Sequence, residues 1–364
     1  MSFRPFLDDP APDFAAVERI IRGQEPPRRV HLVELLMDAE IMRVLSEDYG
    51  GRRWIPLKEG NEALYYPQLV DLYHHLGYDS VNVMPPWIGH PDPPERYGDD
   101  TAPLSRGRRR WIEERHGLIA HRADLERFPW TTIRADYRPI EFAARALPPG
   151  MKLTLMGTVF QHVVFTLLGT ERFLYMVYDD ADLVGEVFER WGQIVYDMYA
   201  ALVDMDEIGA IWHADDVGFN TSTLVSPDLL RRHLLPWLRR YADLAHAHGK
   251  TFWLHCCGNV YDTGLIEDLI DDVGVDAFHS FEDAILPVAE FRSRYGHRIA
   301  ALGGVDMGAL ARWDRAELCV YMRDILHRCM VGGRYLFGSG NTIANYVPVA
   351  NYLAMLEEAR RWRA

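Results

Sequence analysis

The sequence is poor in cysteine, with four in 364 residues, and two of these, Cys256 and Cys257, are adjacent. Such spacing makes a poor disulfide framework, so we expect reduced thiols and a cytoplasmic protein. The chain also lacks any apolar run of the roughly 18 residues that a transmembrane helix needs. Its first residues show no apolar signal segment. We therefore expect no contact with a membrane.

Positive charge is also scarce. The chain has 39 Lys and Arg residues against 53 Asp and Glu residues, which gives a formal net charge of -14. An acidic protein repels the phosphate backbone of nucleic acids unless a basic patch compensates. The one dense basic run, residues 106–115 (RGRRRWIEER), is interleaved with acids, which favours a solvated or helical surface. No nucleic-acid partner is expected.

No Gly/Ser linker interrupts the chain, and no G-x-G-x-x-G turn follows its first candidate strand. Short apolar segments instead alternate with longer amphipathic ones, such as the helix expected over residues 227–248 between Ser226 and Gly249. This alternation predicts an α/β fold, a single (β/α)8 TIM barrel, rather than a doubly wound open sheet. The eight candidate strands cover residues 30–36, 80–84, 153–158, 208–213, 251–255, 277–280, 299–302 and 334–337.

The barrel is expected to span residues 28–364, after an N-terminal extension formed by residues 1–27. Residues 85–149 are rich in Pro, Arg, Asp and Trp and are too long for a simple crossover, which indicates an insertion after the second strand. In a parallel barrel such an insertion lies on the carboxyl-terminal face. It would act there as a lid over the active site, or else as a packing arm or dimer contact.

The strongest chemical signal is WLHCCGN at residues 253–259, where an apolar strand leads directly into a histidine and two thiols. In an extended chain His255 and Cys257 point to the same side and can bind one ion, while Cys256 faces away. Imidazole and thiolate together suit zinc. The spacing alone also fits a buried histidine packed beside two cysteines, and a catalytic zinc would need a third protein ligand.

A second polar cluster is WHADDVG at residues 212–218, again at the end of a predicted strand. Asp215 and Asp216 cannot both point into the barrel, because successive side chains alternate along an extended chain. One of them would orient a substrate or serve as a base, while the other caps a turn or pairs with a cation. A solvated turn without a catalytic role is the alternative.

Two more clusters follow later strands. In HSFED, residues 279–283, His279 or an acid such as Glu282 would supply a missing metal ligand or a proton relay. In GSGN, residues 338–341, the glycines would let the backbone approach a ligand closely.

Four ordered segments resemble the uroporphyrinogen decarboxylase superfamily. They are the run SPDLLRRHLLPWLRRYADLAHAHGKTFWLHCCGN, then GVDAFHSF, LGGVD, and finally GSGNTIANYVPVANYLAMLEEARRW. The N-terminal half is similar only loosely, through GTVFQHVVFTLLGTERFLYMVYDDADLVGEVFERW. The resemblance implies a TIM barrel, and it implies either a cofactor-free decarboxylase or a zinc-dependent methyltransferase that works with corrinoid proteins.

The two branches are expected to differ in their motifs. True decarboxylases of the family carry an Arg-rich run after the first strand and an Asp after the second, but this sequence has ELLMDAE from Glu34 and VMPPW ending at Trp87. The methyltransferase branch carries His-x-Cys-Gly, which His255 and Cys257 match. That branch also supplies a later Cys ligand, and here the position is Ser339.

Because serine is a poor zinc ligand, another side chain must complete a metal site, if one is retained. The candidates for the third ligand are Glu282, Asp216, His279 and Glu34.

The leading hypothesis is a zinc-dependent methyltransferase that moves a methyl group between a small methylated substrate or thiol and a corrinoid (cobalamin) protein. The alternatives are a metal-free decarboxylase-like lyase and a catalytically silent ligand-binding barrel. A homodimer is expected only from general symmetry statistics and the family. The predicted site comprises Asp215, Asp216 and His279 as catalytic residues, His255, Cys257 and Glu282 as metal ligands, and Glu34, Trp87, His213, Asn259, Ser339 and Asn341 as substrate-binding residues.

Overall fold

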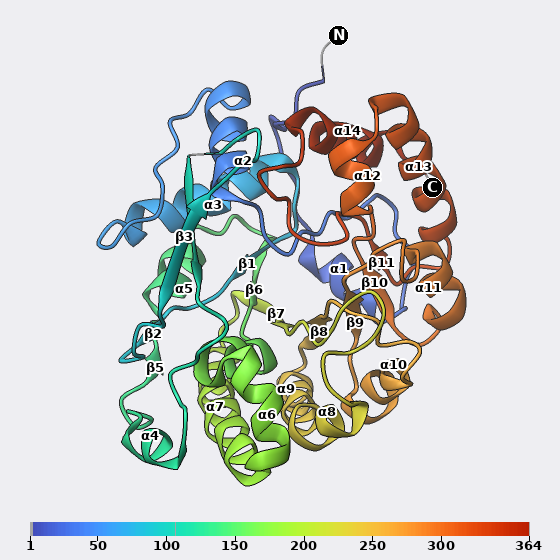
Figure 1. Cartoon of the computed structure of the whole chain (residues 1–364). Coiled ribbons are helices and arrows are strands. Elements are labelled where there is room, and N and C mark those ends of the chain that lie inside the picture. The colour runs from blue at the N-terminus through green and yellow to red at the C-terminus, as the bar shows by residue number, and fades with distance from the viewer. Residues whose placement is uncertain (1–2, 106, 364) are drawn as a thin grey trace.

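A curled sheet of seven parallel strands forms the centre of the molecule (Figure 1). The computed structural model describes residues 3–105 and 107–363. The spatial order of the strands follows their order in the chain, as expected for successive right-handed βαβ units. The strands are β1 (Ser80–Val83), β6 (Lys152–Leu155), β7 (Ile208–Ala214), β8 (Thr251–His255), β9 (Ala277–His279), β10 (Ala300–Leu302) and β11 (Tyr335–Leu336).

Seven of the eight predicted strands are thus confirmed, with shorter bounds at several ends. The prediction of a strand over residues 30–36 is wrong, because only Leu32 forms bridges there, to Tyr78 beside β1 and to Phe337 beside β11. Beyond this point the side chain of Asn82 binds the carbonyl of Leu35 at 3.3 Å. A side chain therefore replaces the ladder bond that a longer strand would need.

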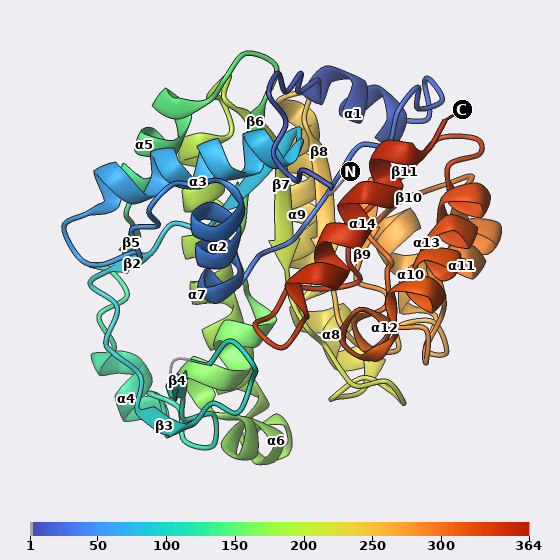
Figure 2. The ribbon, with the colours of Figure 1, turned by 90° about the horizontal axis from the view of Figure 1, so that it is seen from above.

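Helices cover the outer face of the curled sheet (Figures 1 and 2). Helix α7 (Ala181–Leu202), for example, buries an apolar stripe in which Trp191 and Val195 are fully buried. Asp306 and Asp314 directly precede helices α12 (Met307–Arg312) and α13 (Arg315–Cys329), and their side chains accept backbone N–H bonds as N-caps. The outer helices are α2 (Ala39–Val44), α3 (Glu62–Leu76), α5 (Arg138–Ala146), α6 (Thr170–Asp179), α7 (Ala181–Leu202), α10 (Leu265–Asp268), α11 (Val288–Tyr295), α12 (Met307–Arg312), α13 (Arg315–Cys329) and α14 (Val349–Arg361), with π-helical turns η1 (Leu45–Tyr49), η2 (His162–Leu168) and η3 (Leu269–Val273).

The helix predicted over residues 227–248 is interrupted. It consists of α8 (Pro227–His233) and α9 (Leu235–Ala247). Pro236 lies at the first turn of α9, where its missing N–H costs nothing but where the helix must start afresh. The predicted ends are correct, since the Ser226 side chain accepts the N–H of Leu229 and Gly249 has a φ of +72°.

Helix α1 (Phe14–Ile21), within the predicted N-terminal extension, packs against the end of the sheet where the strands begin. Its residues Phe14 and Ile20 belong to the same apolar cluster as the inward-facing Trp212 and Trp253. The ring of Phe14 stacks on Trp253 with centroids 6.0 Å apart. The helix therefore closes the amino-terminal end of the sheet, opposite the predicted site.

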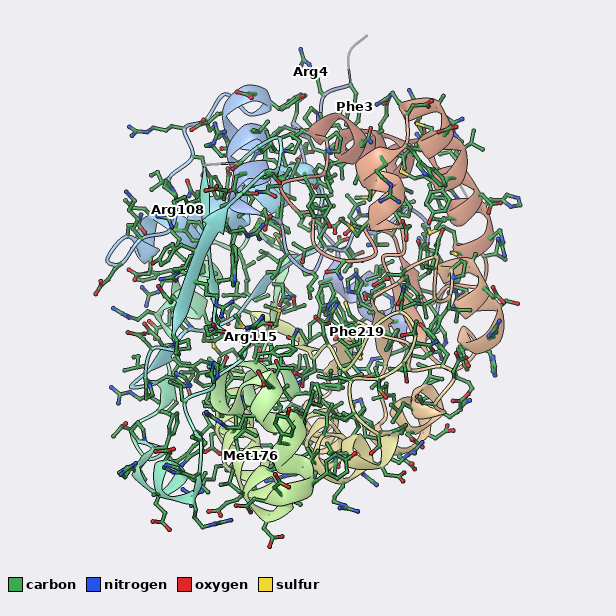
Figure 3. All side chains as sticks on the ribbon, in the orientation of Figure 1. Phe3, Arg4, Arg108, Arg115, Met176 and Phe219 are labelled. Carbon is green, nitrogen blue, oxygen red and sulfur yellow. The ribbon has the colours of Figure 1, made fainter. Side chains whose placement is uncertain are left out.

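Residues 85–149, the predicted insertion, contain two small antiparallel sheets and helix α4 (Arg122–Arg127) before α5 packs beside α3. Residues 108–112 of the basic run form the exposed strand β4 rather than a helix, and Arg106 lies outside the described residues (Figure 3). Asn345, in the loop after β11, donates to Asp100 at 2.7 Å and ties the segment to the carboxyl-terminal side. The role of residues 85–149 as a lid stays a prediction. The small sheets pair β2 (Trp87–Ile88) with β5 (Arg134–Ala135), and β3 (Glu95–Asp99) with β4 (Arg108–Ile112).

None of the helices in residues 3–105 and 107–363 combines the length and apolar character required to cross a bilayer.

Candidate metal centre

The register between β7 and β8 places Asp216 beside Cys257. Ala214 pairs with His255, and the ladder continues past both strands, because Asp215 donates its N–H to the His255 carbonyl at 2.9 Å. Asp216 then faces the same side as His255, while Asp215 faces the outer helices. The expectation that only one of the two aspartates points inward is therefore correct.

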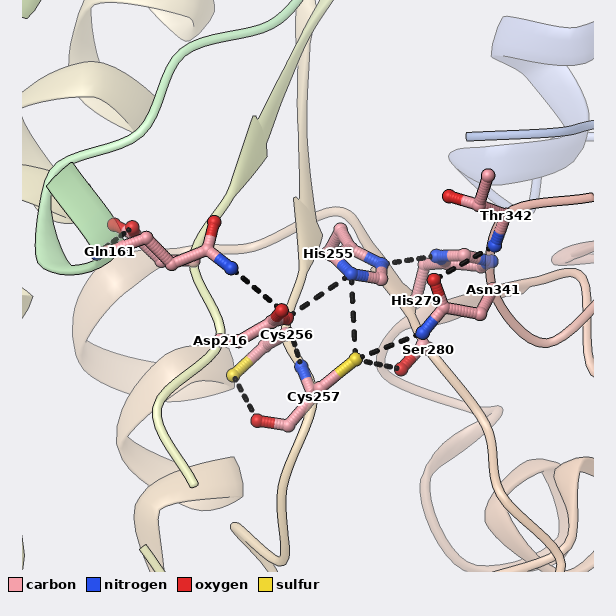
Figure 4. A network of polar contacts seen from close by, with 10 residues as sticks. Gln161, Asp216, His255, Cys256, Cys257, His279, Ser280, Asn341 and Thr342 are labelled. Atoms are coloured by element: carbon pink, nitrogen blue, oxygen red, sulfur yellow. Dashed lines mark hydrogen bonds and ion pairs between the residues drawn. The ribbon is translucent and has the colours of Figure 1, made fainter. Parts of the chain in front are cut away.

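Asp216, His255 and Cys257 form the cluster at the carboxyl ends of these strands (Figure 4). One ligand atom from each lies within 4.8 Å of the others. His255 Nε2 is 3.2 Å from Asp216 Oδ1 and 3.6 Å from Cys257 Sγ. Among the described residues, no other group of three or more His, Cys, Asp or Glu side chains brings its ligand atoms this close together. Nitrogen, sulfur and oxygen donors meet at one point, which is the ligand set that Zn²⁺ accepts.

The site is electrostatically coupled. Burial lowers the pKa of His255, but the neighbouring Cys257 and Asp216 outweigh burial and raise this pKa to about 10. Burial would likewise raise the pKa of Asp216, but His255 and the Cys257 N–H hold it at about 2. Without a metal, the protonated ring of His255 therefore supplies the positive charge between the Asp216 carboxylate and the Cys257 sulfur.

A second histidine orients His255. Burial, and after it the charge of His255, lowers the pKa of His279 well below the usual histidine value, so this ring is neutral. His279 Nε2 lies 3.2 Å from the Ser339 carbonyl, to which it donates, and this leaves Nδ1 as an acceptor. His255 Nδ1, 2.6 Å away, donates to it. His255 Nε2 is consequently directed toward Asp216 and Cys257, as a metal-binding histidine requires.

Both oxygens of Asp216 are held as well. Oδ1 accepts the backbone N–H of Cys257 at 2.9 Å, and Oδ2 accepts the side-chain amide of Gln161 at 2.7 Å. Sequence reasoning missed Gln161. A signal exists in its sequence position, because it is a polar residue shortly after β6, in the helical turn that leads into η2.

Ser339 does not join the cluster. Its N–H donates to Glu34 Oε1 at 3.0 Å, and its hydroxyl is bound by Glu34 Oε2 and by the Asn341 carbonyl. Burial raises the pKa of Glu34 to about 8, against the opposing hydrogen bonds from Ser339. Glu34 and Ser339 therefore form a closed, buried contact between residues 30–36 and the loop after β11.

The other predicted site residues are dispersed. Asp215 accepts the N–H groups of Val159 and Gln161 and contacts His213 Nε2 at 2.8 Å. Asp215 and His213 therefore hold the segment after β6 in place and do not face the cluster. Asn259 binds Asp262 within its own loop at 2.8 Å. Trp87 packs edge-on against Trp191, and the half-buried Glu282 lies outside the close cluster. Asn341 is the exception, because its Nδ2 lies 3.1 Å from Cys257 Sγ.

Cys256 faces away from the cluster, as predicted, and burial raises the pKa of its thiol well above the usual value. Cys319 and Cys329 lie in α13, apart from the site. The thiol that faces the candidate centre is therefore Cys257.

The fold and the cluster together define an α/β protein with a curled parallel sheet and a candidate metal centre at the carboxyl ends of its strands. The chain belongs to the uroporphyrinogen decarboxylase family, whose model matches residues 157–362. This match contains the whole cluster. No curated protein matches the sequence significantly.

Among solved structures, a methyltransferase from Methanosarcina mazei shares the fold with a TM-score of 0.67, at 17% identity, over 96% of this chain and 98% of that one. A candidate vitamin-B12-independent methionine synthase from Listeria monocytogenes matches more loosely, with a TM-score of 0.46 at 11% identity, over 93% and 99% of the two chains.

Proposed function

We propose that the protein is a zinc-dependent methyltransferase that moves a methyl group between a small methylated substrate or a thiol and the cobalamin of a corrinoid protein. The observation that carries the proposal is the convergence of Asp216, His255 and Cys257. Membership of the family and the methyltransferase with the same fold support the reaction class. The bridges on both sides of Leu32 support a closed (β/α)8 barrel as its frame.

The donor set fits a zinc ion. Three side chains with N, S and O donors leave a fourth position open, as in catalytic rather than structural zinc sites. The second nitrogen of His255 is already engaged by His279 at 2.6 Å, which fixes the tautomer that a ligand needs. Asp216 takes the place of the Cys ligand that the family resemblance implies at Ser339.

A bound zinc would supply Lewis acidity, either to lower the pKa of a substrate thiol or to polarise the group that carries the methyl. The protein's own residues would hold the reactants. Gln161 and the Cys257 N–H fix the Asp216 carboxylate, and His279 fixes the imidazole. The buried surroundings of His255, which is 4% exposed, would keep bulk water from the reacting atoms.

The same site is poorly suited to decarboxylation of a polyanionic porphyrinogen. Glu34, which is buried, lies where the resemblance implies substrate-binding arginines, and its hydrogen bonds go to Ser339. Asp216 and the half-buried Glu282 add to the acidic character. None of these three side chains offers the positive charge that the many carboxylates of such a substrate would need.

The first experiment is elemental analysis of protein purified without chelators, for the unmodified chain and for Cys257→Ala. We expect near-stoichiometric zinc that is lost in the variant. Cys256→Ala is the matched control, because it removes a neighbouring thiol that faces away from the cluster, and it should keep its metal. Zinc absent from all three proteins would contradict the proposal.

The reaction itself is tested with free methylcobalamin and 2-mercaptoethanol, followed by the absorbance change on demethylation. The zinc-loaded protein should accelerate the transfer, and Cys257→Ala should not. Release of CO₂ from carboxylic acids without metal would favour the lyase instead, and tight ligand binding without turnover would favour a silent barrel. A homodimer and a cytoplasmic location stay predictions from the sequence.

A further inference from the structure

The sulfur of Cys257 has two hydrogen-bonding neighbours, which lie in the segments that follow two other strands (Figure 4). Asn341 Nδ2, in the loop after β11, lies 3.1 Å from Sγ. Ser280 Oγ, directly after β9, lies 3.2 Å from it. Asn341 is not among the residues that would bind zinc, and its amide nitrogen can only donate. The sulfur is therefore held from the side opposite Asp216.

The orientation of the Asn341 amide is fixed by a second bond. Its Oδ1 accepts the backbone N–H of Thr342 at 2.8 Å. With the oxygen engaged there, the NH₂ group must face the sulfur. An amide turned the other way would bring two acceptors, Oδ1 and the sulfur, against each other.

The loop that carries Asn341 is itself rigidly placed. Gly338 and Gly340 allow its close approach, because a Cβ at these positions would lie 1.8 Å from the Val33 carbonyl oxygen and 2.2 Å from the Phe281 carbonyl oxygen. Between the glycines, Ser339 is locked by Glu34. The same loop that the family resemblance associates with a Cys ligand is thus built in this chain to present a donor.

We infer that Asn341 and Ser280 are positioning residues for the Cys257 sulfur, which they hold in place and whose electron density they reduce by hydrogen bonding. This inference rests on the proposed metal site and deepens it. Hydrogen bonds to a thiolate stabilise its lone pairs, so the sulfur donates less charge to a bound metal. A metal held this way is a stronger Lewis acid toward substrate.

The test uses cobalt(II) in place of zinc, because its charge-transfer band reports directly on the thiolate. Removing a donor raises the energy of the sulfur lone pairs, so the band should move to longer wavelength in Asn341→Leu and in Ser280→Ala. Chelator competition should show zinc affinity reduced about tenfold, because losing the fixed position of the sulfur outweighs its stronger donation to the metal, and this is the lower end of the range for lost supporting hydrogen bonds.

Two further variants separate the hydrogen bond from other effects. Thr342→Ala changes the adjacent side chain but keeps the N–H that orients Asn341, so band and affinity should stay those of the unmodified chain. Asn341→Gln keeps an amide and should restore part of the band position. If Asn341→Leu does not fold, as judged by circular dichroism, Ser280→Ala gives the same readout.

The outcomes are distinct. A thiolate–cobalt band that is unchanged in both Asn341→Leu and Ser280→Ala would overturn this inference and leave the proposed metal site intact. No thiolate band in the unmodified protein, together with no bound zinc, would overturn the metal site and this inference together.

Discussion

Two aspartate–histidine pairs lie at opposite ends of the sheet, and they differ in their third partner. Where the strands begin, Asp79 contacts His31 Nδ1 at 2.8 Å and the guanidinium of Arg29 at 2.5 Å. Where the strands end, Asp216 contacts His255 Nε2 at 3.2 Å, and the third group is the thiol of Cys257. The first cluster has an arginine as its third group, which is a permanent cation, whereas the third group of the second cluster is a thiol, which brings no positive charge.

This difference explains why one pair is structural and the other is a candidate centre. Burial raises the pKa of Asp79, but His31 and Arg29 outweigh it and lower that pKa below the usual value. The charge there is balanced within the protein. Around Asp216 the balance depends on a protonated His255, which a divalent cation can replace. A buried Asp–His pair therefore indicates a functional site only when the charge of the third group beside it is also known.

The largest expected effect on stability comes from the Asp79 cluster, where the strands begin. Asp79→Ala leaves His31 buried beside an unpaired guanidinium and frees the Asp13 N–H, which Asp79 accepts at 2.7 Å. Breaking a buried pair of this kind costs about 3 kcal/mol of unfolding free energy. Urea unfolding followed by circular dichroism measures the loss. The zinc content should not change, and loss of zinc would contradict the separation of the two ends.

The same variant has a defined pH dependence. The folded-state pKa of Asp79 is lowered, so its contribution is present above the unfolded pKa of about 3.9 and is lost as pH falls through the folded pKa. The stability difference between the unmodified protein and Asp79→Ala should therefore shrink on acidification below about pH 4. A difference that stays constant across this range would show that Asp79 acts through packing.

At the other end, Asp216→Asn should weaken zinc binding with little loss of stability. Loss of a residue that merely supports a ligand reduces metal affinity about 10- to 100-fold, and loss of a ligand should cost at least as much. Chelator competition measures the affinity. Asparagine keeps an oxygen for the Cys257 N–H, so the loop should remain in place.

The adjacent aspartate is the matched control. Asp215→Asn disturbs the contacts to His213 and to the backbone of Val159 and Gln161, so it should lower stability. Because Asp215 faces away from the cluster, zinc affinity should be nearly unchanged. Equal losses of affinity in the two variants would mean that Asp216 acts only by shaping the loop.

Glu34 differs from Asp79, because it is a buried carboxyl whose hydrogen bonds come from Ser339 and not from a cation. Its pKa is raised to about 8 by burial, so the stability it provides is present at low pH and is lost as pH rises toward this value. The unfolding free energy should fall by at most about 1.4 kcal/mol per pH unit between the unfolded pKa and pH 8. Glu34→Gln should flatten this slope in metal-free protein. If Glu34→Gln leaves the slope of unfolding free energy against pH unaltered, other titrating groups cause that slope.

Much of this arrangement could be predicted from the sequence. The alternation of apolar segments gave seven correct strands, and the His-x-Cys spacing placed His255 and Cys257 on one face. Both signals are local, since they depend only on the period of an extended chain. Family resemblance then predicted zinc chemistry, and the family match is confirmed.

The third candidate ligand could not be chosen from the sequence. Asp216 adjoins Cys257 only because Ala214 pairs with His255, and register between strands is a tertiary property. His279, expected to be catalytic, meets His255 through the register between β8 and β9. The break before α9 had a local signal in Pro236, which the amphipathic pattern of residues 227–248 obscured.

The smallest expected effect comes from Arg29, the cation that makes the Asp79 cluster balanced. Its side chain is 43% exposed, so solvent screens its charge, and Arg29→Met should cost about 1 kcal/mol or less. Added salt should reduce the difference further, because the exposed half of the pair is screened. Thermal unfolding at low and high ionic strength measures both. If Arg29→Met were as damaging as Asp79→Ala, the guanidinium would be the main partner of the carboxylate. His31, buried at 2.8 Å from Asp79, would then contribute little, contrary to the comparison.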